Sequence, residues 1–313
     1  MSVICRASFV RLVRYSIGKA ESYGVLLRDA VLALPELARQ LGEKLPSNLE
    51  QFVDLDLNYL KKAEFLIQSA KKEEVASSSH LLKDVRLLAP LPKPGKIVCL
   101  GLNYYDHAAE TNMAVPTELI VFMKPYTAII GPDESIVKPS VVEALDYEGE
   151  LSIVVGRRAK GVPLTEIASH IFGYTIMNDV SARDIQFRIS QWTKGKSFDT
   201  FAPTGPCITT ANELSQTSDL AIRTWVNGEI RQNSSTSKMV FNVQEIVHRL
   251  NCVMSLEPGD IIATGTPAGV GFTLKPNPVF LQHGDIVKID IQGIGFLENK
   301  VVDQRAPPGK DCV

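Results

Sequence analysis

The sequence lacks the cysteine and histidine patterns that stabilise small disulfide-rich or zinc-dependent proteins. It contains only five cysteines and five histidines in 313 residues, and no C-x-x-C or H-x-x-x-H motif occurs. An odd number of scattered cysteines argues against a disulfide framework and favours a reducing compartment. If a metal ion is bound, carboxylates must supply most of its ligands, which indicates a hard cation.

The chain also lacks an excess of charge of either sign and any long apolar run. It has 33 basic and 35 acidic side chains, and 45% of its residues are hydrophobic. Without a net positive field, we expect no nucleic-acid partner. No apolar run approaches the roughly 18–20 residues that cross a bilayer, so we expect no membrane-spanning segment. The apolar fraction is too high for a disordered chain.

The first 20 residues are basic and contain no acid. That composition resembles a mitochondrial presequence. The competing interpretation is a strand over residues 9–15, with residues 25–27 following Gly24 as the next strand of a hairpin. A strand there leaves only about eight residues as a leader. We therefore expect the strand and a cytoplasmic protein, with a mitochondrial location as the alternative.

The chain divides at a proline-rich stretch. Residues 36–72 show helical spacing of apolar side chains, and Pro90, Pro92, Pro94 and Gly95 follow. This pattern predicts a small N-terminal domain over residues 1–90 and a second domain over residues 91–313.

The second domain is predicted to be rich in strands. Apolar, largely β-branched runs bounded by turn residues occur at 96–100, 120–123, 151–155 and 224–226. Asn227-Gly228 is a strong hairpin signal. Helices are fewer, at 164–169, after Ser181 and at 243–250. Because strands and helices do not alternate regularly, we predict an α+β fold with a large mixed or antiparallel β component.

Two segments combine a histidine or carboxylates in a suggestive spacing. On a helix, His107 and Glu110 would share a face and could hydrogen-bond through one water. A histidine paired with a carboxylate in this way can act as a general base. The alternative is a solvated helix start. In a strand, Glu148 and Glu150 point to one side and need a cation between them, unless both are solvated. Asp179 is either a third carboxylate or a helix N-cap.

Three further segments carry candidate substrate contacts. Arg183 and Gln186, three residues apart, could hold a carboxylate or carbonyl group. Lys196 could offer its charge to an oxyanion, or belong to a simple basic loop. The Gly-rich segment 264–271 could place N–H groups and a Thr hydroxyl against an anion, or form only a tight turn.

Taken together and in this order, the segments resemble the fumarylacetoacetate hydrolase family over about residues 90–303. The matching pieces are Gly101-x-Asn103-Tyr104-x-x-His107-x-x-Glu110, Asp146-x-Glu148-x-Glu150-Leu151, Asn178-Asp179-Val180-Ser181-Ala182-Arg183-Asp184, Gly195-Lys196-Ser197-Phe198-Asp199 and Thr264-Gly265-Thr266-Pro267-x-Gly269-Val270-Gly271. The similarity is greatest to the branch of fumarylacetoacetate hydrolase domain-containing protein 2. Residues 9–15 resemble the start of the small N-terminal domain of many members.

The resemblance implies a mixed β-roll catalytic domain, a small N-terminal α+β domain and a homodimer. It implies a bound divalent cation, Mg²⁺ or alternatively Mn²⁺ or Ca²⁺. The implied site residues are the metal ligands Glu148, Glu150 and Asp179, the catalytic residues His107, Glu110 and Lys196, and the substrate contacts Arg183, Gln186 and Thr266. One departure is Gly149, where relatives often carry a larger residue.

The function implied is chemistry on a small enolisable 2-oxo or β-diketo acid. Such an acid can chelate a metal through its carboxylate and adjacent carbonyl, and the cation and Lys196 would then stabilise an enolate. Hydrolysis of a C–C bond in an acylpyruvate-type substrate is the first expectation. The alternative is oxaloacetate keto–enol tautomerisation or decarboxylation. A more remote alternative is a non-catalytic, metal-dependent binding protein.

Overall fold

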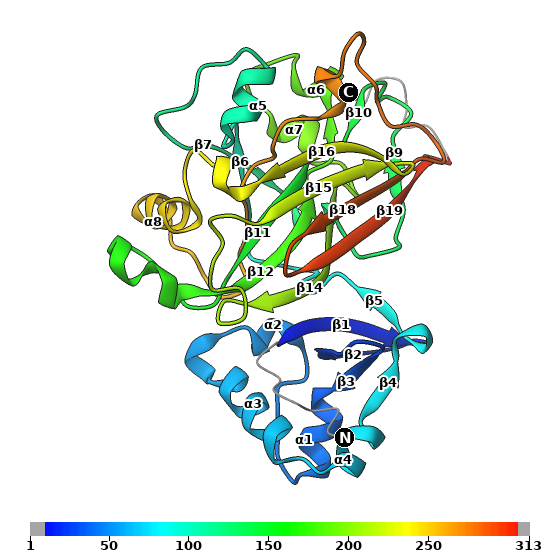
Figure 1. Ribbon diagram of the computed structural model, residues 1–313, viewed down its shortest axis with the longest axis vertical. Coiled ribbons are helices and arrows are strands. Elements are labelled where there is room, and N and C mark those ends of the chain that lie inside the picture. The colour runs from blue at the N-terminus through cyan, green and yellow to red at the C-terminus, as the bar shows by residue number, and fades with distance from the viewer. Residues whose placement is uncertain (1–9, 306–313) are drawn as a thin grey trace.

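The computed structural model describes residues 10–305, and its N-terminal part is a small sheet covered by helices (Figure 1). The elements are β1 (Arg11–Ile17), β2 (Ala20–Leu26), β3 (Ala30–Ala33), α1 (Leu34–Gln40), α2 (Leu49–Phe52), η1 (Leu55–Leu57), α3 (Tyr59–Ser69), α4 (Lys72–Ser77), β4 (Ser79–Leu81), η2 (Leu82–Asp84) and β5 (Arg86–Leu88). β1 and β2 form the predicted hairpin, with Ile17 opposite Ala20. Phe9, part of the predicted strand, lies outside the described residues.

The N-terminal strands continue into the central sheet of the molecule. Arg11 of β1 pairs with Thr209 of β14, so one 12-stranded sheet runs through both parts of the chain. Its other members are β6 (Ile97–Gly101), β7 (Ile120–Lys124), β8 (Ile129–Ile130), β11 (Gly149–Val155), β12 (Ile171–Asn178), β14 (Ala202–Thr210) and β17 (Ile261–Ala263). β6 and β17 pair in parallel while most other pairs are antiparallel, so the sheet is mixed.

A second sheet of five strands packs on the central one. Its order is β16 (Glu229–Ser235), β15 (Ala221–Val226), β18 (Ile286–Ile291), β19 (Gly295–Asp303) and β9 (Ile136–Lys138). The predicted hairpin joins β15 and β16, because Asn227 and Gly228 take the φ angles of 53° and 80° that a type I′ turn requires. Contacts of β15, β18 and β19 with β11, β12 and β14 close the core between the two sheets.

Short helices occupy the connections. They are α5 (Tyr105–Glu110), η3 (Tyr126–Ala128), η4 (Leu164–His170), α6 (Arg183–Gln186), α7 (Thr193–Lys196), η5 (Thr236–Lys238), α8 (Val243–Val253) and η6 (Gly271–Thr273), with the small β10 (Leu145–Asp146) and β13 (Ser181–Ala182) pair. The helix predicted at 164–169 is a 3₁₀ helix, and its buried residues, Ile167 and His170, are one 3₁₀ turn apart. The predicted α+β class is confirmed.

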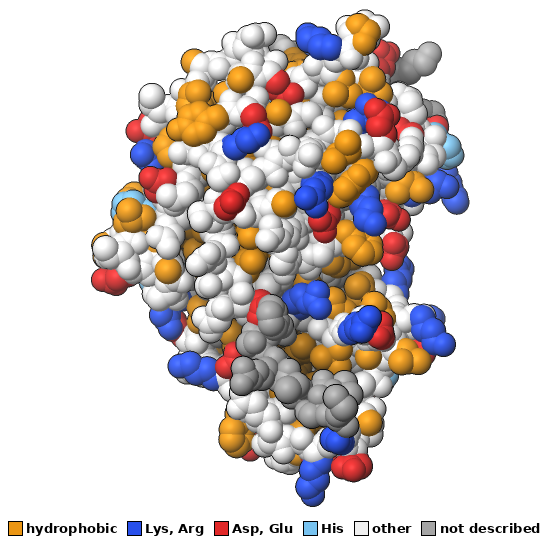
Figure 2. All heavy atoms as spheres, in the orientation of Figure 1, with side chains coloured by type: hydrophobic (Ala, Val, Ile, Leu, Met, Phe, Trp, Pro, Cys, Tyr) orange, Lys and Arg blue, Asp and Glu red, His pale blue; other side chains and the backbone are white. Residues whose placement is uncertain are grey.

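The elements that matter for function lie at one end of the molecule. α5, α6 and α7 gather at the end remote from the N-terminal helices (Figure 1). On the face seen in Figure 2, basic and acidic side chains are interspersed, as expected from the near balance of charge. None of the helices within residues 10–305 has the length and hydrophobicity needed to cross a membrane.

Candidate metal centre and active-site pocket

Three buried carboxylates meet where β11 begins and β12 ends. Glu148 precedes β11, Glu150 is its second residue, and Asp179 follows β12. The antiparallel pair Gly149 and Asn178 brings these ends together, and the Asp179 N–H donates to the Glu148 carbonyl at 2.9 Å. One oxygen from each carboxylate lies within 4.8 Å of the others. Strand pairing thus assembles a carboxylate triad from residues that are 31 positions apart at most.

Asp179 caps no helix. The helix that follows it, α6, has Ala182 at its N-cap position and no side-chain cap. The carboxylate of Asp179 instead faces two lysines, described below. Of the two interpretations that its sequence position allowed, the structure therefore rejects the N-cap.

Glu150 is the member of the triad that most needs a cation. Its Oε2 accepts from the Gly265 N–H at 3.0 Å, whereas its buried Oε1 has no hydrogen-bond partner among residues 10–305. Burial, followed by repulsion from Asp179 and Glu148, raises the pKa of Glu150 well above its usual value. A set of three carboxylates with an unused buried oxygen fits a hard divalent cation.

Two buried lysines flank Asp179. Lys196 donates to Glu148 Oε2 at 2.9 Å and to Asp179 Oδ2 at 2.8 Å, and Lys124 pairs with Asp179 Oδ1. Burial alone would lower the pKa of Lys196, but Asp179 and Glu148 outweigh it and raise that pKa. Lys196 is therefore a charged group inside the protein and not part of a solvated basic loop.

Sequence reasoning missed Lys124. It ends the apolar run of β7, a position where a lysine is usually taken for the first solvent-exposed residue after a strand. Here its side chain is fully buried, and Nζ also donates to the Val180 carbonyl at 3.1 Å. The only available signal was the lysine's place between an apolar strand and Pro125.

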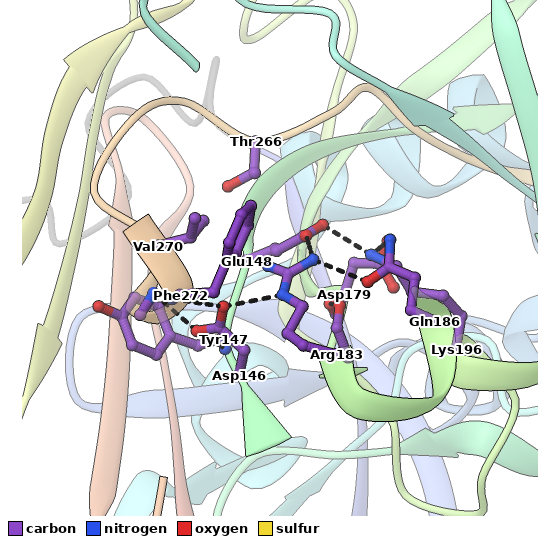
Figure 3. A network of polar contacts seen from close by, with 12 residues as sticks. Asp146, Tyr147, Glu148, Asp179, Arg183, Gln186, Lys196, Thr266, Val270 and Phe272 are labelled. Atoms are coloured by element: carbon purple, nitrogen blue, oxygen red, sulfur yellow. Dashed lines mark hydrogen bonds and ion pairs between the residues drawn. The ribbon is translucent and has the colours of Figure 1, made fainter. Parts of the chain in front are cut away.

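Arg183 links the triad to a fourth buried acid, Asp146 (Figure 3). Its Nε donates to Asp146 Oδ2 at 2.9 Å, and its Nη1 lies 2.6 Å from Glu148 Oε1 and donates to Gln186 Oε1 at 3.0 Å. Its Nη2 is buried and has no partner within the described part of the chain. Arg183 thus keeps one donor unused at the site.

His107 and Glu110 form a direct pair on α5. Nδ1 of His107 lies 2.7 Å from Glu110 Oε1, so the expectation of a bridging water was wrong. The other oxygen of Glu110 accepts from the Gly269 N–H at 2.9 Å and from Thr273 Oγ1 at 2.8 Å. Only 7% of His107 is exposed, which rules out a solvated helix start. With Nδ1 held by the carboxylate, Nε2 is the nitrogen left to accept a proton.

Thr266 is held by a network that includes Gln232, another residue that sequence reasoning missed. Thr266 Oγ1 accepts from Gln232 Nε2 at 2.7 Å and donates to the Gly149 carbonyl at 3.1 Å. A Cβ at Gly149 would lie 2.5 Å from Thr224 Oγ1 and 3.1 Å from Gln232 Oε1. The glycine between the two triad glutamates is therefore required by this packing.

One pocket joins these groups. Of the nine residues predicted from the sequence, six line it: His107, Glu148, Arg183, Gln186, Lys196 and Thr266. The other three adjoin these residues. Asp179 pairs with Lys196, and Glu110 pairs with His107. Glu150 lies close to Asp179. Aromatic side chains form much of the remaining wall, namely Phe122, Phe187, Trp192 and Phe272. The pocket thus combines a charged floor with an apolar wall.

Comparisons with known proteins agree with this geometry. The family model of the fumarylacetoacetate hydrolase C-terminal region matches residues 96–302. The chain is 40% identical to the fumarylacetoacetate hydrolase domain-containing protein 2 homolog of Dictyostelium discoideum, over 95% of this chain and 99% of that one. It is 42% identical to the mitochondrial oxaloacetate tautomerase fahd2 of Xenopus laevis, over 78% and 77%. The structure of fumarylacetoacetate hydrolase from Exiguobacterium antarcticum superposes with a TM-score of 0.79 at 34% identity, covering 94% of this chain and all of that one.

Proposed function

The chain belongs to the fumarylacetoacetate hydrolase family and is a metal-dependent enzyme of that family, and we propose that it interconverts the keto and enol forms of a small 2-oxo acid, with oxaloacetate as the first candidate. The observation that carries the proposal is the His107–Glu110 pair, which shares one pocket with Lys196 and Arg183. Oxaloacetate is preferred because relatives over 40% identical, from Xenopus laevis and Bos taurus, are named oxaloacetate tautomerases.

The proposed cofactor is Mg²⁺, with Mn²⁺ or Ca²⁺ as alternatives, held by Glu148, Glu150 and Asp179. The all-oxygen donor set and the unpartnered Oε1 of Glu150 support a hard cation. When bound, such an ion polarises the carboxylate and carbonyl oxygens of a chelating 2-oxo acid.

The charge of the buried cluster supports an anionic substrate. In the described chain it consists of the carboxylates Asp146, Glu148, Glu150 and Asp179 and the cations Lys124, Arg183 and Lys196. With all four carboxylates ionised, as metal binding requires, four negative against three positive groups leave one negative charge, which a divalent cation would convert to one positive charge. That balance favours an anionic ligand, and Nη2 of Arg183 is a donor without a partner among residues 10–305.

The side chains can carry out the proton transfer. Nε2 of His107, with Nδ1 fixed by Glu110, would take the proton from C3 of the 2-oxo acid. The C–H electron pair then becomes the C2=C3 double bond, and the carbonyl oxygen becomes an oxyanion. Lys196, only 1% exposed and charged, stabilises that oxyanion. Return of the proton to oxygen gives the enol.

The second candidate is hydrolysis of a C–C bond in an acylpyruvate. The same His107–Glu110 pair can deprotonate a water, and the similar structure from Exiguobacterium antarcticum is a fumarylacetoacetate hydrolase. Loss of carbon dioxide from oxaloacetate would pass through the same enolate and is a third variant of this chemistry.

We also propose that the protein is a homodimer and that its two domains meet near residue 90. The proposed location is cytoplasmic, with mitochondria as the alternative. Exposed apolar side chains on the sheet edge at β7, among them Val121 and Met123, support an association between copies. Light scattering on the purified protein tests the dimer, and a monomer at micromolar concentration would contradict it.

The function is tested by following the decay of enol-oxaloacetate with and without the protein and Mg²⁺, beside assays on acetylpyruvate and fumarylpyruvate. We expect acceleration of enol decay that depends on the metal and is abolished in Glu148→Ala and Glu110→Gln. A folded, Mg²⁺-loaded protein that accelerates none of these reactions would contradict the proposal. Hydrolysis of acetylpyruvate without tautomerisation would select the second candidate.

A further inference from the structure

We propose that Phe272 is a specificity-determining residue that keeps water from His107 and thereby directs the pocket toward proton transfer and away from hydrolysis. The inference rests on the proposed function, because it concerns how one site chooses between two reactions that share an enolate. Phe272 lies in η6 and lines the pocket. It is absent from the residues singled out by the sequence.

The ring of Phe272 lies beside both Arg183 and His107. The guanidinium carbon of Arg183 lies 4.5 Å from its centroid, and the ring of His107 stands edge-on to it at 6.4 Å. On its outer side, Phe187 packs edge-on at 5.3 Å and is itself 57% exposed. Phe272, itself partly buried, is therefore an apolar neighbour of both the base and the cation.

The backbone that carries Phe272 is clamped on the Arg183 side by Asp146. One carboxylate oxygen of Asp146 accepts from the Gly271 N–H at 2.7 Å, and the other accepts from the Phe272 N–H at 3.1 Å and from Arg183 (Figure 3). A Cβ at Gly271 would lie 2.2 Å from the Val279 carbonyl oxygen and 2.6 Å from Asp146. The ring is thus held on a fixed turn.

Glu110 clamps the same turn on the His107 side. It accepts from the Gly269 N–H and from Thr273 Oγ1 while its other oxygen holds His107. The two carboxylates that orient His107 and Arg183 therefore also fix the residues on both sides of Phe272.

The two reactions differ in their need for water at His107. Tautomerisation moves a proton between C3 and the C2 oxygen and changes no bond between heavy atoms. Hydrolysis needs a water that gives its proton to His107 while its oxygen bonds to the distal carbonyl. The C–C bond then breaks with its electron pair on C3, which takes the proton back, so that an acylpyruvate yields a carboxylic acid and pyruvate. An apolar ring beside His107 hinders only the second route.

The test compares Phe272→Ala and Phe272→Leu with Phe296→Ala, a matched removal of an exposed ring on β19. On Mg²⁺-loaded protein, we measure kcat/KM for acetylpyruvate hydrolysis and for oxaloacetate tautomerisation. The Ala variant should raise the hydrolysis-to-tautomerisation ratio by about tenfold or more. Leu, which keeps an apolar cover, should leave the ratio within about threefold of wild type, and Phe296→Ala should not change it.

Two further measurements distinguish this role from a structural one. Mg²⁺ affinity by calorimetry should stay unchanged in Phe272→Ala, since an apolar ring supplies no ligand to the ion. If the Ala variant does not fold, Phe272→Val takes its place, with an expected rise of about threefold. An unchanged ratio, or no hydrolysis in either variant, overturns the inference while wild-type tautomerisation stands. A wild type inactive on both substrates overturns the proposed function itself.

Discussion

The two sheets of this protein differ in how much of each strand is buried. In the central sheet, β11, β12 and β14 are buried at every position, including Glu150 and Asn178. In the outer sheet, β15, β18 and β19 alternate between buried and exposed positions. A polar side chain on the outward-facing side of the outer sheet meets water. One on the central strands must find a partner inside the protein, as must the buried Thr224 and Gln232 on the inward side of the outer sheet.

The consequence is visible in two charged residues. Lys288 of the outer sheet lies over the ring of Phe296 at the surface, 4.1 Å from its centroid. Glu150 of the central sheet has a carboxylate oxygen with no partner among the described residues. A buried charge is not solvated, so it is costly unless it is paired. Charged side chains at the ends of the central strands therefore favour the binding of an oppositely charged ligand. Four substitutions, three of them with a matched control, test this contrast.

The largest effect is expected from Glu150→Gln. Loss of a triad carboxylate should weaken Mg²⁺ binding and lower activity by about 100-fold or more. In the metal-free protein, the raised pKa of Glu150 means that the free energy of unfolding falls as pH rises through that pKa. Glu150→Gln should remove this slope and should not destabilise the metal-free protein.

The matched control is Glu229→Gln on the outer sheet, whose side chain is 67% exposed. Its activity and its unfolding at each pH should equal those of the wild type. Enzyme assays and denaturant titrations at several pH values measure both variants. Equal losses in the two variants would refute a special role for the buried position.

The next effect concerns packing. Ile153→Ala on β11, where the side chain is fully buried, should lower the free energy of unfolding by about 2–5 kcal/mol. Ile286→Ala on β18, where the residue is 42% exposed, should cost below about 1 kcal/mol. Urea unfolding measures both. Similar costs would show that the two sheets are equally buried in solution.

A smaller effect is expected at the turn of the outer sheet. Asn227→Ala should cost about 1–2 kcal/mol, because alanine disfavours a φ of 53° and loses the hydrogen bonds to Asp285 and Ile286. Thermal melting detects this loss, with the exposed Asn233→Ala as control. Activity should be retained, since the turn lies outside the pocket. A loss of activity at full folding would contradict that separation.

The smallest effect is expected from Lys288→Ala. A surface cation–π contact contributes about 0.5 kcal/mol, so the midpoint of urea unfolding should hardly change. A cost above about 1.5 kcal/mol would mean that the outer face of this sheet is covered and not solvated.

Local signals predicted much of the outer fold. Asn227-Gly228 predicted its hairpin because only a few residue types accept two successive positive φ angles. The strand predicted at residues 9–15 corresponds to β1, which spans Arg11–Ile17 and so lies two positions later in the chain. At residues 164–169 the sequence predicted a helix but not its type, because the spacing of apolar residues in a short segment does not distinguish an α-helix from a 3₁₀ helix.

The sequence by itself determined which side chains are available for chemistry, since the order of carboxylates, histidine, arginine and lysine is a property of the chain. Only the tertiary structure decided how they act. Lys124 and Gln232 join the site, His107 contacts Glu110 without a water, and Asp146 reaches across to the turn that carries Phe272. Burial and strand pairing set these contacts, and both depend on residues far apart in the sequence.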